Sequence, residues 1–178
     1  MSAFKMTWWG LAVAGFLALA CKREDAKPAA AAAPATPVPA ATPPPAAQGE
    51  DWNDAQIAWK SYDEGLAAAA TEKKPVCLVF FTTWCPHCKN FSRVFKDPRV
   101  VEASKSLVMV RLDKDKNPEI SRKFAPDGEY IPRTYFLASN GTLAPSIHAP
   151  RTQFQYFYDE SNPASILAGL EAAKKELN

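Results

Sequence analysis

Metal-binding side chains are scarce in this sequence, which has four cysteines and two histidines among 178 residues. Two of the cysteines, Cys85 and Cys88, have the spacing of one zinc-ligand pair, but a structural zinc site takes about four ligands. The remaining candidates do not form a second pair with that spacing; they are Cys21, Cys77, His87 and His148. We therefore expect no metal, and half of a zinc site is the lesser alternative for Cys85 and Cys88.

The sequence also lacks an excess of charge of either sign. Its 21 basic and 19 acidic residues give a formal net charge of +2. Lys5 lies in an amino-terminal segment that we expect to be removed, which lowers the net charge to +1. Proteins that bind nucleic acid by its phosphates carry a basic surface, so we expect no nucleic-acid partner.

A long hydrophobic run is missing as well. The longest apolar stretch covers the thirteen residues 8–20, whereas a membrane-spanning helix needs roughly 20. Together with Lys5 and the small residues Ala18 and Ala20, it predicts a secretory signal peptide over residues 1–20. An uncleaved anchor helix is the alternative.

Cys21 follows the expected cleavage site directly. This arrangement resembles a bacterial lipoprotein signal, in which that cysteine is lipidated and becomes the mature amino terminus. Such signals usually have Leu three residues before the cysteine, where this sequence has Ala18, so an ordinary secreted protein is the alternative. Lys22 takes the place of the aspartate that marks inner-membrane retention. The resemblance implies a periplasmic lipoprotein anchored through Cys21, with the outer membrane preferred.

Residues 21–50 are rich in alanine and proline and hold almost nothing that a core could bury. Repeated prolines favour extended polyproline conformations of about 3 Å per residue. We interpret this segment as a semi-stiff tether, which leaves residues 51–178 as the folded domain.

Hydrophobic periodicity divides the folded domain into helices and strands. We expect helices over residues 52–70, 86–96, 98–103 and 118–124 and a last helix that begins at Asn162-Pro163. We expect strands over residues 76–81, 107–112, 134–138 and 142–147. The last two strands are predicted to pair antiparallel across Asn140-Gly141, a two-residue hairpin signal.

The most informative stretch is Trp84-Cys85-Pro86-His87-Cys88, directly after the apolar run 76–81. A disulfide between residues three apart needs a tight turn, which a strand running into a helix supplies. Cys85 then lies at the helix amino terminus, where backbone N–H groups and the helix dipole stabilise a thiolate. Pro86 fits the first turn, where its missing N–H costs nothing. We therefore expect Cys85 to be the attacking sulfur and Cys88 the resolving one.

The order of elements is that of the thioredoxin fold, an α/β fold with a mixed central sheet flanked by helices on both faces. Three sequence elements strengthen the resemblance: the run into Trp84-Cys85-x-x-Cys88, the segment 127–133 with Tyr130-Ile131-Pro132-Arg133, and an aromatic cluster over 156–158. Together they resemble the small thioredoxin-domain proteins of the endoplasmic reticulum, the anterior-gradient type. The resemblance covers roughly residues 52–177 and implies their fold and thiol chemistry.

The thioredoxin fold implies roles for three further residues. Pro132 matches the cis-proline that faces the active-site disulfide, and Ile131 before it is expected to pair with an extended substrate chain. Trp84 is expected to pack beside the cysteines and shape the docking surface, with ordinary half-buried packing as the alternative.

His87 bears on the direction of electron flow. A protonated imidazole beside the thiolate favours the reduced form and makes the disulfide a stronger oxidant. The same Pro-His pair separates the cysteines of the periplasmic oxidant DsbA, whose reduction potential is about −120 mV against roughly −270 mV for thioredoxin. A merely solvated loop histidine is the alternative.

One feature of thioredoxin is missing. Thioredoxin has a buried aspartate six residues before the first cysteine, where this sequence has Val79. Proton removal from Cys88 would then rest on solvent or on another residue, for which Glu129, close to Pro132, is a candidate. Cys77 on the central strand is expected to serve as a small apolar residue, with a third redox thiol as the alternative.

We therefore expect an exported thiol-disulfide oxidoreductase, more an oxidant than a reductant, with no cofactor beyond the redox-active disulfide of Cys85 and Cys88. Its expected partners are cysteine-containing exported proteins, a redox protein that recycles the disulfide, and the membrane through lipid on Cys21. The alternatives are a tethered binding or chaperone-like module and a dedicated reductase for one partner, such as a cytochrome-maturation protein.

Overall fold

The computed structural model of the protein describes residues 51–177. The expected signal peptide (residues 1–20), Cys21 and the tether (residues 21–50) lie outside the described residues. Within the described part of the chain, no helix is long and apolar enough to span a membrane. The elements, in order, are α1 (Tyr62–Glu72), β1 (Val76–Phe81), α2 (Pro86–Val94), α3 (Pro98–Ser104), β2 (Val108–Asp113), α4 (Pro118–Lys123), β3 (Arg133–Leu137) and α5 (Pro163–Glu176).

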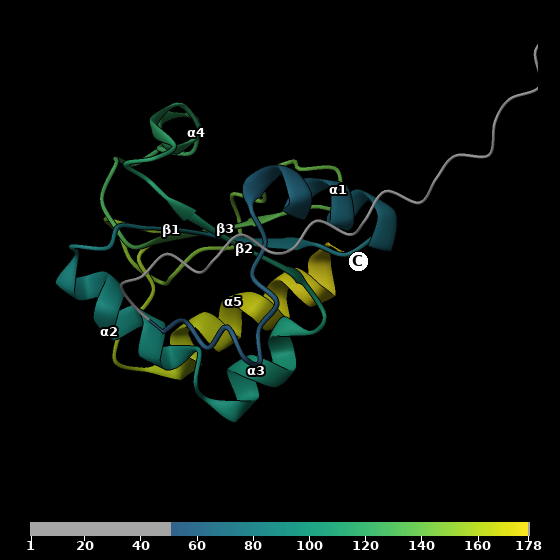
Figure 1. The fold of residues 1–178 in the computed structure, drawn as a ribbon, viewed down its shortest axis with the longest axis horizontal. Helices are drawn as coiled ribbons and strands as arrows, with labels where there is room; N and C mark the ends of the chain where they lie inside the picture. Colours follow the sequence, from purple (N-terminus) through teal and green to yellow (C-terminus); the bar gives the residue numbers. More distant parts are fainter. Residues whose placement is uncertain (1–50, 178) are drawn as a thin grey trace, which may run out of the picture. The chain divides into compact units, whose positions relative to one another are not determined.

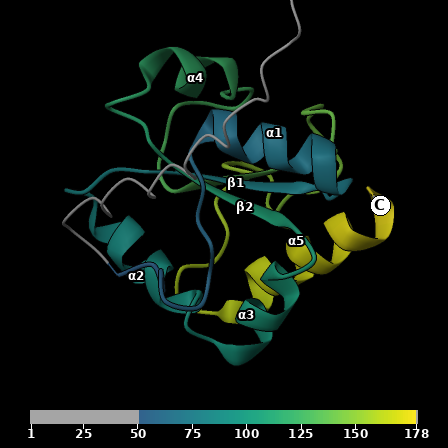
Figure 2. The same ribbon diagram turned by 45° about the vertical axis from the view of Figure 1, so that its right-hand side comes forward.

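The three strands form one mixed sheet in the order β2-β1-β3, with β2 parallel and β3 antiparallel to β1. Helices α1 and α4 lie on one side of it and α2, α3 and α5 on the other (Figures 1 and 2). This arrangement confirms the predicted fold class.

Every residue of the central strand β1 is buried, as its continuous apolar run predicts. Successive side chains of a strand point to opposite faces. Cys77, Val79 and Phe81 accordingly belong to the core under α2, α3 and α5. Val76, Leu78 and Phe80 belong to the core under α1 and α4, a division that requires helices on both faces.

The first predicted helix is wrong over its first ten residues, because α1 begins at Tyr62 rather than at residue 52. Glu64 supplies the start signal: its carboxylate accepts hydrogen bonds from the backbone N–H (3.3 Å) and hydroxyl (2.7 Å) of Ser61. The preceding segment instead lies beside β2, where Lys60 forms a single parallel bridge with Val110 and its N–H donates to Met109 O at 2.9 Å. Burial of Trp52 therefore reflects packing of an irregular segment rather than of a helix.

The predicted strand over residues 142–147 is not formed. Leu143 makes a single antiparallel bridge to Leu137, and the Ala144 N–H donates to Phe136 O at 2.9 Å. Pro145 follows directly and has no N–H with which to extend the ladder. The hairpin turn itself is present, since the Gly141 N–H donates to Ala138 O at 2.8 Å and Gly141 has φ +83°.

The helix starts that the sequence marks with an X-Pro pair are confirmed. Asn162 caps α5, its side chain accepting a hydrogen bond from the Ala164 N–H at 3.0 Å, and Pro163 occupies the first position. Asp97 caps α3 in the same manner, through the Arg99 N–H at 2.9 Å.

Buried thiol and phenol groups predict a loss of stability at alkaline pH. Burial raises the pKa of Cys77, Tyr135 and Tyr158 above their usual values of 9.0 for the thiol and 10.0 for the phenols. Above about pH 9 the unfolded chain releases protons that the folded chain retains, so the free energy of unfolding falls as the pH rises.

Tyr158→Phe tests this prediction, because the Tyr158 hydroxyl is buried with no hydrogen-bond partner among the described residues. Removing it should leave the free energy of unfolding at pH 7 unchanged or up to about 1 kcal/mol higher, and should reduce the loss between pH 7 and pH 10. Urea unfolding at both pH values measures this; an equal alkaline loss in the two proteins would contradict it.

Candidate active site

Cys85 caps the amino terminus of α2, at the end of the short turn that follows β1. Its backbone is extended (φ −81°, ψ 117°), and Pro86 occupies the first helical position. The Cys88 N–H, one turn into the helix, donates to Cys85 Sγ at 3.4 Å. The helix amino terminus thus directs a backbone donor at this sulfur, which is the arrangement that stabilises a thiolate.

Both cysteines are thiols in this structure. Cys88 is fully buried, whereas Cys85 retains 3% of its surface exposed. Both residues are buried, and Cys85 is the slightly more exposed of the two. The division into attacking and resolving thiols stays a prediction.

The predicted cis bond between Ile131 and Pro132 is confirmed. The Ile131 carbonyl lies opposite the cysteines, with Cys85 Sγ donating to its oxygen at 3.9 Å. Pro132 directly precedes β3, which pairs with β1 from Phe80↔Arg133 onward. Pairing of β3 with β1 thereby brings Cys85 and Ile131, which are 46 positions apart in the sequence, together at the same end of the sheet.

Arg133 holds the loop that carries Ile131 and Pro132. Its guanidinium is buried over the ring of Phe80, 5.0 Å from the centroid. It donates to Gly128 O at 2.9 Å and to Ser121 Oγ at 2.6 Å. Burial lowers the pKa of this guanidinium below its ordinary value, so these hydrogen bonds compensate a charge removed from water.

Trp84 stands on the surface beside Cys85, with 65% of its area exposed. Its indole Nε1–H donates to Asp115 Oδ2 at 2.8 Å. That hydrogen bond, with smaller contributions from Lys114, lowers the pKa of Asp115. Sequence reasoning missed Asp115, although a signal existed: β1 and β2 are parallel, so the residues after each strand meet at the same edge.

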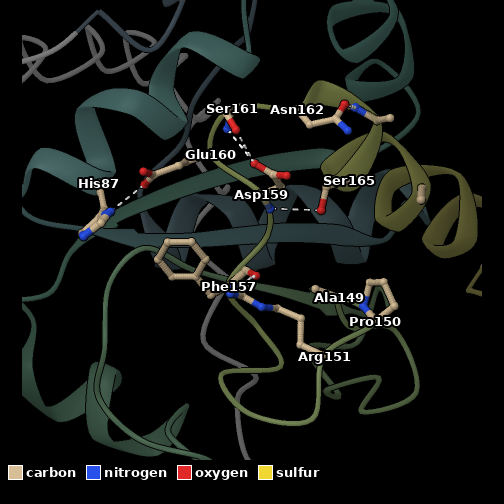
Figure 3. Close-up of a pocket in the computed structure, with 12 residues that line it drawn as sticks. His87, Ala149, Pro150, Arg151, Phe157, Asp159, Glu160, Ser161, Asn162 and Ser165 are labelled. Atoms are coloured by element: carbon tan, nitrogen blue, oxygen red, sulfur yellow. Dashed lines mark hydrogen bonds and ion pairs between the residues drawn. The ribbon is translucent and has the colours of Figure 1, made fainter.

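His87 is exposed and points along the surface toward the loop before α5. Its Nδ1 lies 2.9 Å from Glu160 Oε2, and the other carboxylate oxygen accepts from Asn90 Nδ2 at 3.3 Å. The imidazole also packs edge-on against Phe157, with ring centroids 5.9 Å apart. Figure 3 shows the second ring nitrogen of His87 directed away from Glu160.

Glu160 is a second residue that sequence reasoning missed. It lies 73 positions after His87, and nothing in the local pattern around it indicates a partner on α2. The contact gives His87 a partner across the surface, while 62% of its side chain stays exposed.

An open pocket of about 810 Å³ extends from His87 along the amino-terminal half of α5. Its polar lining is already engaged (Figure 3): Asp159 accepts from Ser161 at 2.9 Å, and the Asp159 N–H donates to Ser165 Oγ at 3.0 Å. Arg151 donates to Phe157 O at 2.9 Å.

The position of the thioredoxin aspartate is filled by the buried side chain of Val79. Glu129, the suggested substitute, is exposed and accepts a hydrogen bond from Ser121 Oγ at 3.4 Å, which places it against α4 rather than against Cys88 on α2. Cys77 is fully buried, and burial raises the pKa of its thiol. Its neutral, apolar character fits the expected role in the core.

No group of three or more His, Cys, Asp or Glu side chains within residues 51–177 is placed to hold a metal ion. What the site does bring together is two thiols, a helix amino terminus and the carbonyl before a cis-proline.

Comparison with known proteins agrees with this geometry. Residues 58–139 match the thioredoxin-like family. Over these residues the chain is similar to thioredoxin-like domains. The J-Trx1 fragment of ERdj5, a solved structure, superposes with a TM-score of 0.51 at 13% sequence identity over 70% of this chain and 54% of that one, which shows a shared fold.

Curated relatives include the anterior gradient proteins, as the resemblance implies. Anterior gradient protein 2 homolog of Homo sapiens is 25% identical over 127 residues, 71% of each chain. Anterior gradient protein 2 of Xenopus tropicalis is 29% identical over 131 residues, 71% of this chain and 74% of its own length. The similarity to these relatives thus extends beyond the cysteine motif to most of the described residues.

Proposed function

We propose that this protein is an exported thiol-disulfide oxidoreductase that acts on cysteines of other exported proteins. The observation that carries the proposal is the position of Cys85 Sγ, between the Cys88 N–H at 3.4 Å and the Ile131 carbonyl at 3.9 Å. A sulfur held there is activated by the helix, backed by a second thiol and bordered by backbone that a substrate chain can approach.

In the oxidising direction a substrate thiolate attacks Cys85 Sγ of the Cys85–Cys88 disulfide and releases Cys88 as a thiolate. A second substrate thiol, in its thiolate form, then attacks the substrate sulfur that is bonded to Cys85 in the mixed disulfide. This forms the substrate disulfide and releases Cys85. The substrate loses two electrons and gains a disulfide, while the protein is reduced to its dithiol. A redox partner must then reoxidise Cys85 and Cys88.

Pro86 and His87 support the oxidising direction. A protonated imidazole stabilises a neighbouring thiolate and therefore the reduced protein, which raises the reduction potential. Glu160 holds the imidazole in place at 2.9 Å. A reductase dedicated to one partner would instead require a low reduction potential, near that of thioredoxin.

The amino terminus supports export and anchoring in this proposal. An export signal over residues 1–20 would direct the domain to the periplasm, where disulfides persist. Lipid on Cys21, followed by the tether over residues 21–50, would hold the domain near the membrane while leaving its redox site accessible to other exported proteins.

Substitution of the two cysteines separates catalysis from binding. Cys85→Ser should abolish turnover in insulin reduction and in refolding of a reduced protein, because it removes the attacking sulfur. Cys88→Ser should instead accumulate mixed disulfides on Cys85, seen by mass spectrometry, because the resolving thiol is missing. Cys77→Ala is the control and should retain turnover. No turnover in the unaltered protein, together with no further loss in Cys85→Ser, would point to a binding or chaperone-like module.

Equilibration with glutathione tests the direction of electron flow. We expect a potential closer to about −120 mV than to about −270 mV, and His87→Ala should lower it by about 30 mV, a tenfold change in the equilibrium constant. Arg93→Ala is a matched control, since Arg93 is a cation in the last turn of the same helix, beyond a Debye length of about 10 Å. A potential near −270 mV, or equal shifts in both variants, would contradict the oxidant assignment.

Cell fractionation tests the anchor. The full chain should sediment with membranes, and Cys21→Ser should move to the soluble periplasmic fraction because it cannot be lipidated. If the Cys21→Ser protein still sediments with membranes, lipid on Cys21 is not the anchor.

A further inference from the structure

A carboxylate from the loop before α5 reaches across to the helix that carries the cysteines. Glu160 uses both of its oxygens there: Oε2 lies 2.9 Å from His87 Nδ1, and Oε1 accepts from Asn90 Nδ2 at 3.3 Å. His87 and Asn90 are three positions apart in α2, and residues with that spacing lie on one face of a helix. Glu160 is therefore held by two contacts from the same face of α2.

The contact determines which nitrogen of His87 carries a proton. An ionised carboxylate has no proton to donate, so the Nδ1 atom that faces it is the donor. The charge of the ring then depends on the other nitrogen, which Figure 3 shows directed away from Glu160. Because 62% of the His87 side chain is exposed, that nitrogen can take a proton from solvent. His87 can thus become charged without losing its contact to Glu160.

The pairing favours the charged ring over the neutral one. A carboxylate within hydrogen-bond distance stabilises the cationic form of an imidazole. The Glu160 side chain is 21% exposed, so solvent screens this pair less than a pair of two fully exposed side chains. Phe157 confines the imidazole further, since the two rings pack edge-on with centroids 5.9 Å apart. The positive charge is therefore both favoured and held in one place.

The position of His87 in α2 puts this charge near the reactive sulfur. Cys85 is the N-cap of α2, and His87 is the second residue of the helix. Two residues along a chain, the Cα atoms lie at most about 7 Å apart, which is within a Debye length of about 10 Å. A positive charge at such a separation stabilises a thiolate. The contact made by Glu160 thereby bears on Cys85, although Glu160 lies 73 positions from His87.

We propose that Glu160 is a positioning residue for the redox reaction, acting on Cys85 through His87. Glu160 keeps the imidazole charged and in place, and the charged imidazole stabilises the Cys85 thiolate. The reduced protein thereby becomes more stable relative to the disulfide. The inference rests on the proposed function and names the residue outside α2 that sets its reduction potential.

Direct repulsion between the Glu160 carboxylate and a Cys85 thiolate acts in the opposite direction. The two effects differ in one respect, because the repulsion does not require His87. Removing His87 therefore separates them, and a double-mutant cycle measures the part that passes through the imidazole. The reaction to follow is balanced: the Cys85–Cys88 disulfide and two molecules of glutathione give the protein dithiol and glutathione disulfide, with two electrons transferred.

Equilibration of the full chain with glutathione at pH 7 measures the cycle. Glu160→Gln keeps the size of the side chain and removes its charge, so it should lower the equilibrium constant for reduction of the protein about threefold. In the His87→Ala background the same substitution should leave the constant unchanged or raise it, because only the direct repulsion remains. An equal change in both backgrounds, or no change when His87 is present, would overturn the proposal.

Asp159→Asn is the matched control, since it also converts a carboxylate to an amide in the loop before α5. The Asp159 carboxylate accepts a hydrogen bond from the Ser161 N–H at 2.9 Å rather than from α2. This variant should keep the equilibrium constant of the unaltered protein. A fall as large as that in Glu160→Gln would show a general effect of charge in the loop and would also overturn the proposal. Melting temperatures identify any variant with a damaged fold.

Alkylation of Cys85 keeps the test independent of exchange with protein substrates. Iodoacetamide reacts with the thiolate, and mass spectrometry locates the product on Cys85 of the reduced full chain. The midpoint of the pH profile should rise by about half a pH unit in Glu160→Gln, the equivalent of a threefold loss of thiolate, and should not rise when His87→Ala is already present. This pattern without turnover would refute the proposed function and retain the role of Glu160. Turnover without this pattern would do the reverse.

Discussion

Complete burial of β1 is the constraint on which the rest of the structure depends. A strand whose six residues are all buried needs a partner strand on each edge and helices on each face. The parallel partner β2 brings the turn with Asp115 to the end of β1, and the antiparallel partner β3 brings Ile131 and Pro132 to the same end. The site around Cys85 and Cys88 is assembled from three distant segments because one apolar strand must be covered on all sides.

The chemistry of the site follows from that position. The first turn of α2 directs the Cys88 N–H at Cys85 Sγ, 3.4 Å away. Two carboxylates contact the residues beside the cysteines rather than the sulfurs: Asp115 accepts a hydrogen bond from Trp84, and Glu160 pairs with His87. Both carboxylates therefore contact residues that lie next to the cysteines in sequence. Asp115 comes from the loop after β2, and Glu160 comes from the loop before α5.

Local patterns predicted the parts of the structure that depend on neighbouring residues. The run over β1, the X-Pro helix starts and the cysteine turn could all be inferred from a few adjacent residues, whereas the cis bond before β3 followed from the resemblance to the thioredoxin fold. The first helix was misplaced because Trp52 and Ile57 have helical spacing but pack as an irregular segment, and only the Ser61–Glu64 pair marks the true start. The predicted strand over residues 142–147 is not formed, because Pro145 has no N–H with which to extend the ladder. Glu160 could not be found, since its partner His87 on α2 lies 73 positions away in the chain.

The irregular segment before α1 has a further consequence for the limits of the domain. Trp52 lies outside the stretch that matches the thioredoxin-like family, which begins at residue 58, yet its ring is buried against Phe81, Phe91 and Phe95. Two of these side chains come from α2 and its carboxyl-terminal end, and the third closes β1. The family match therefore begins inside the chain segment that packs beneath α2, and the aromatic packing that supports the helix after Cys85 includes a residue that precedes the match.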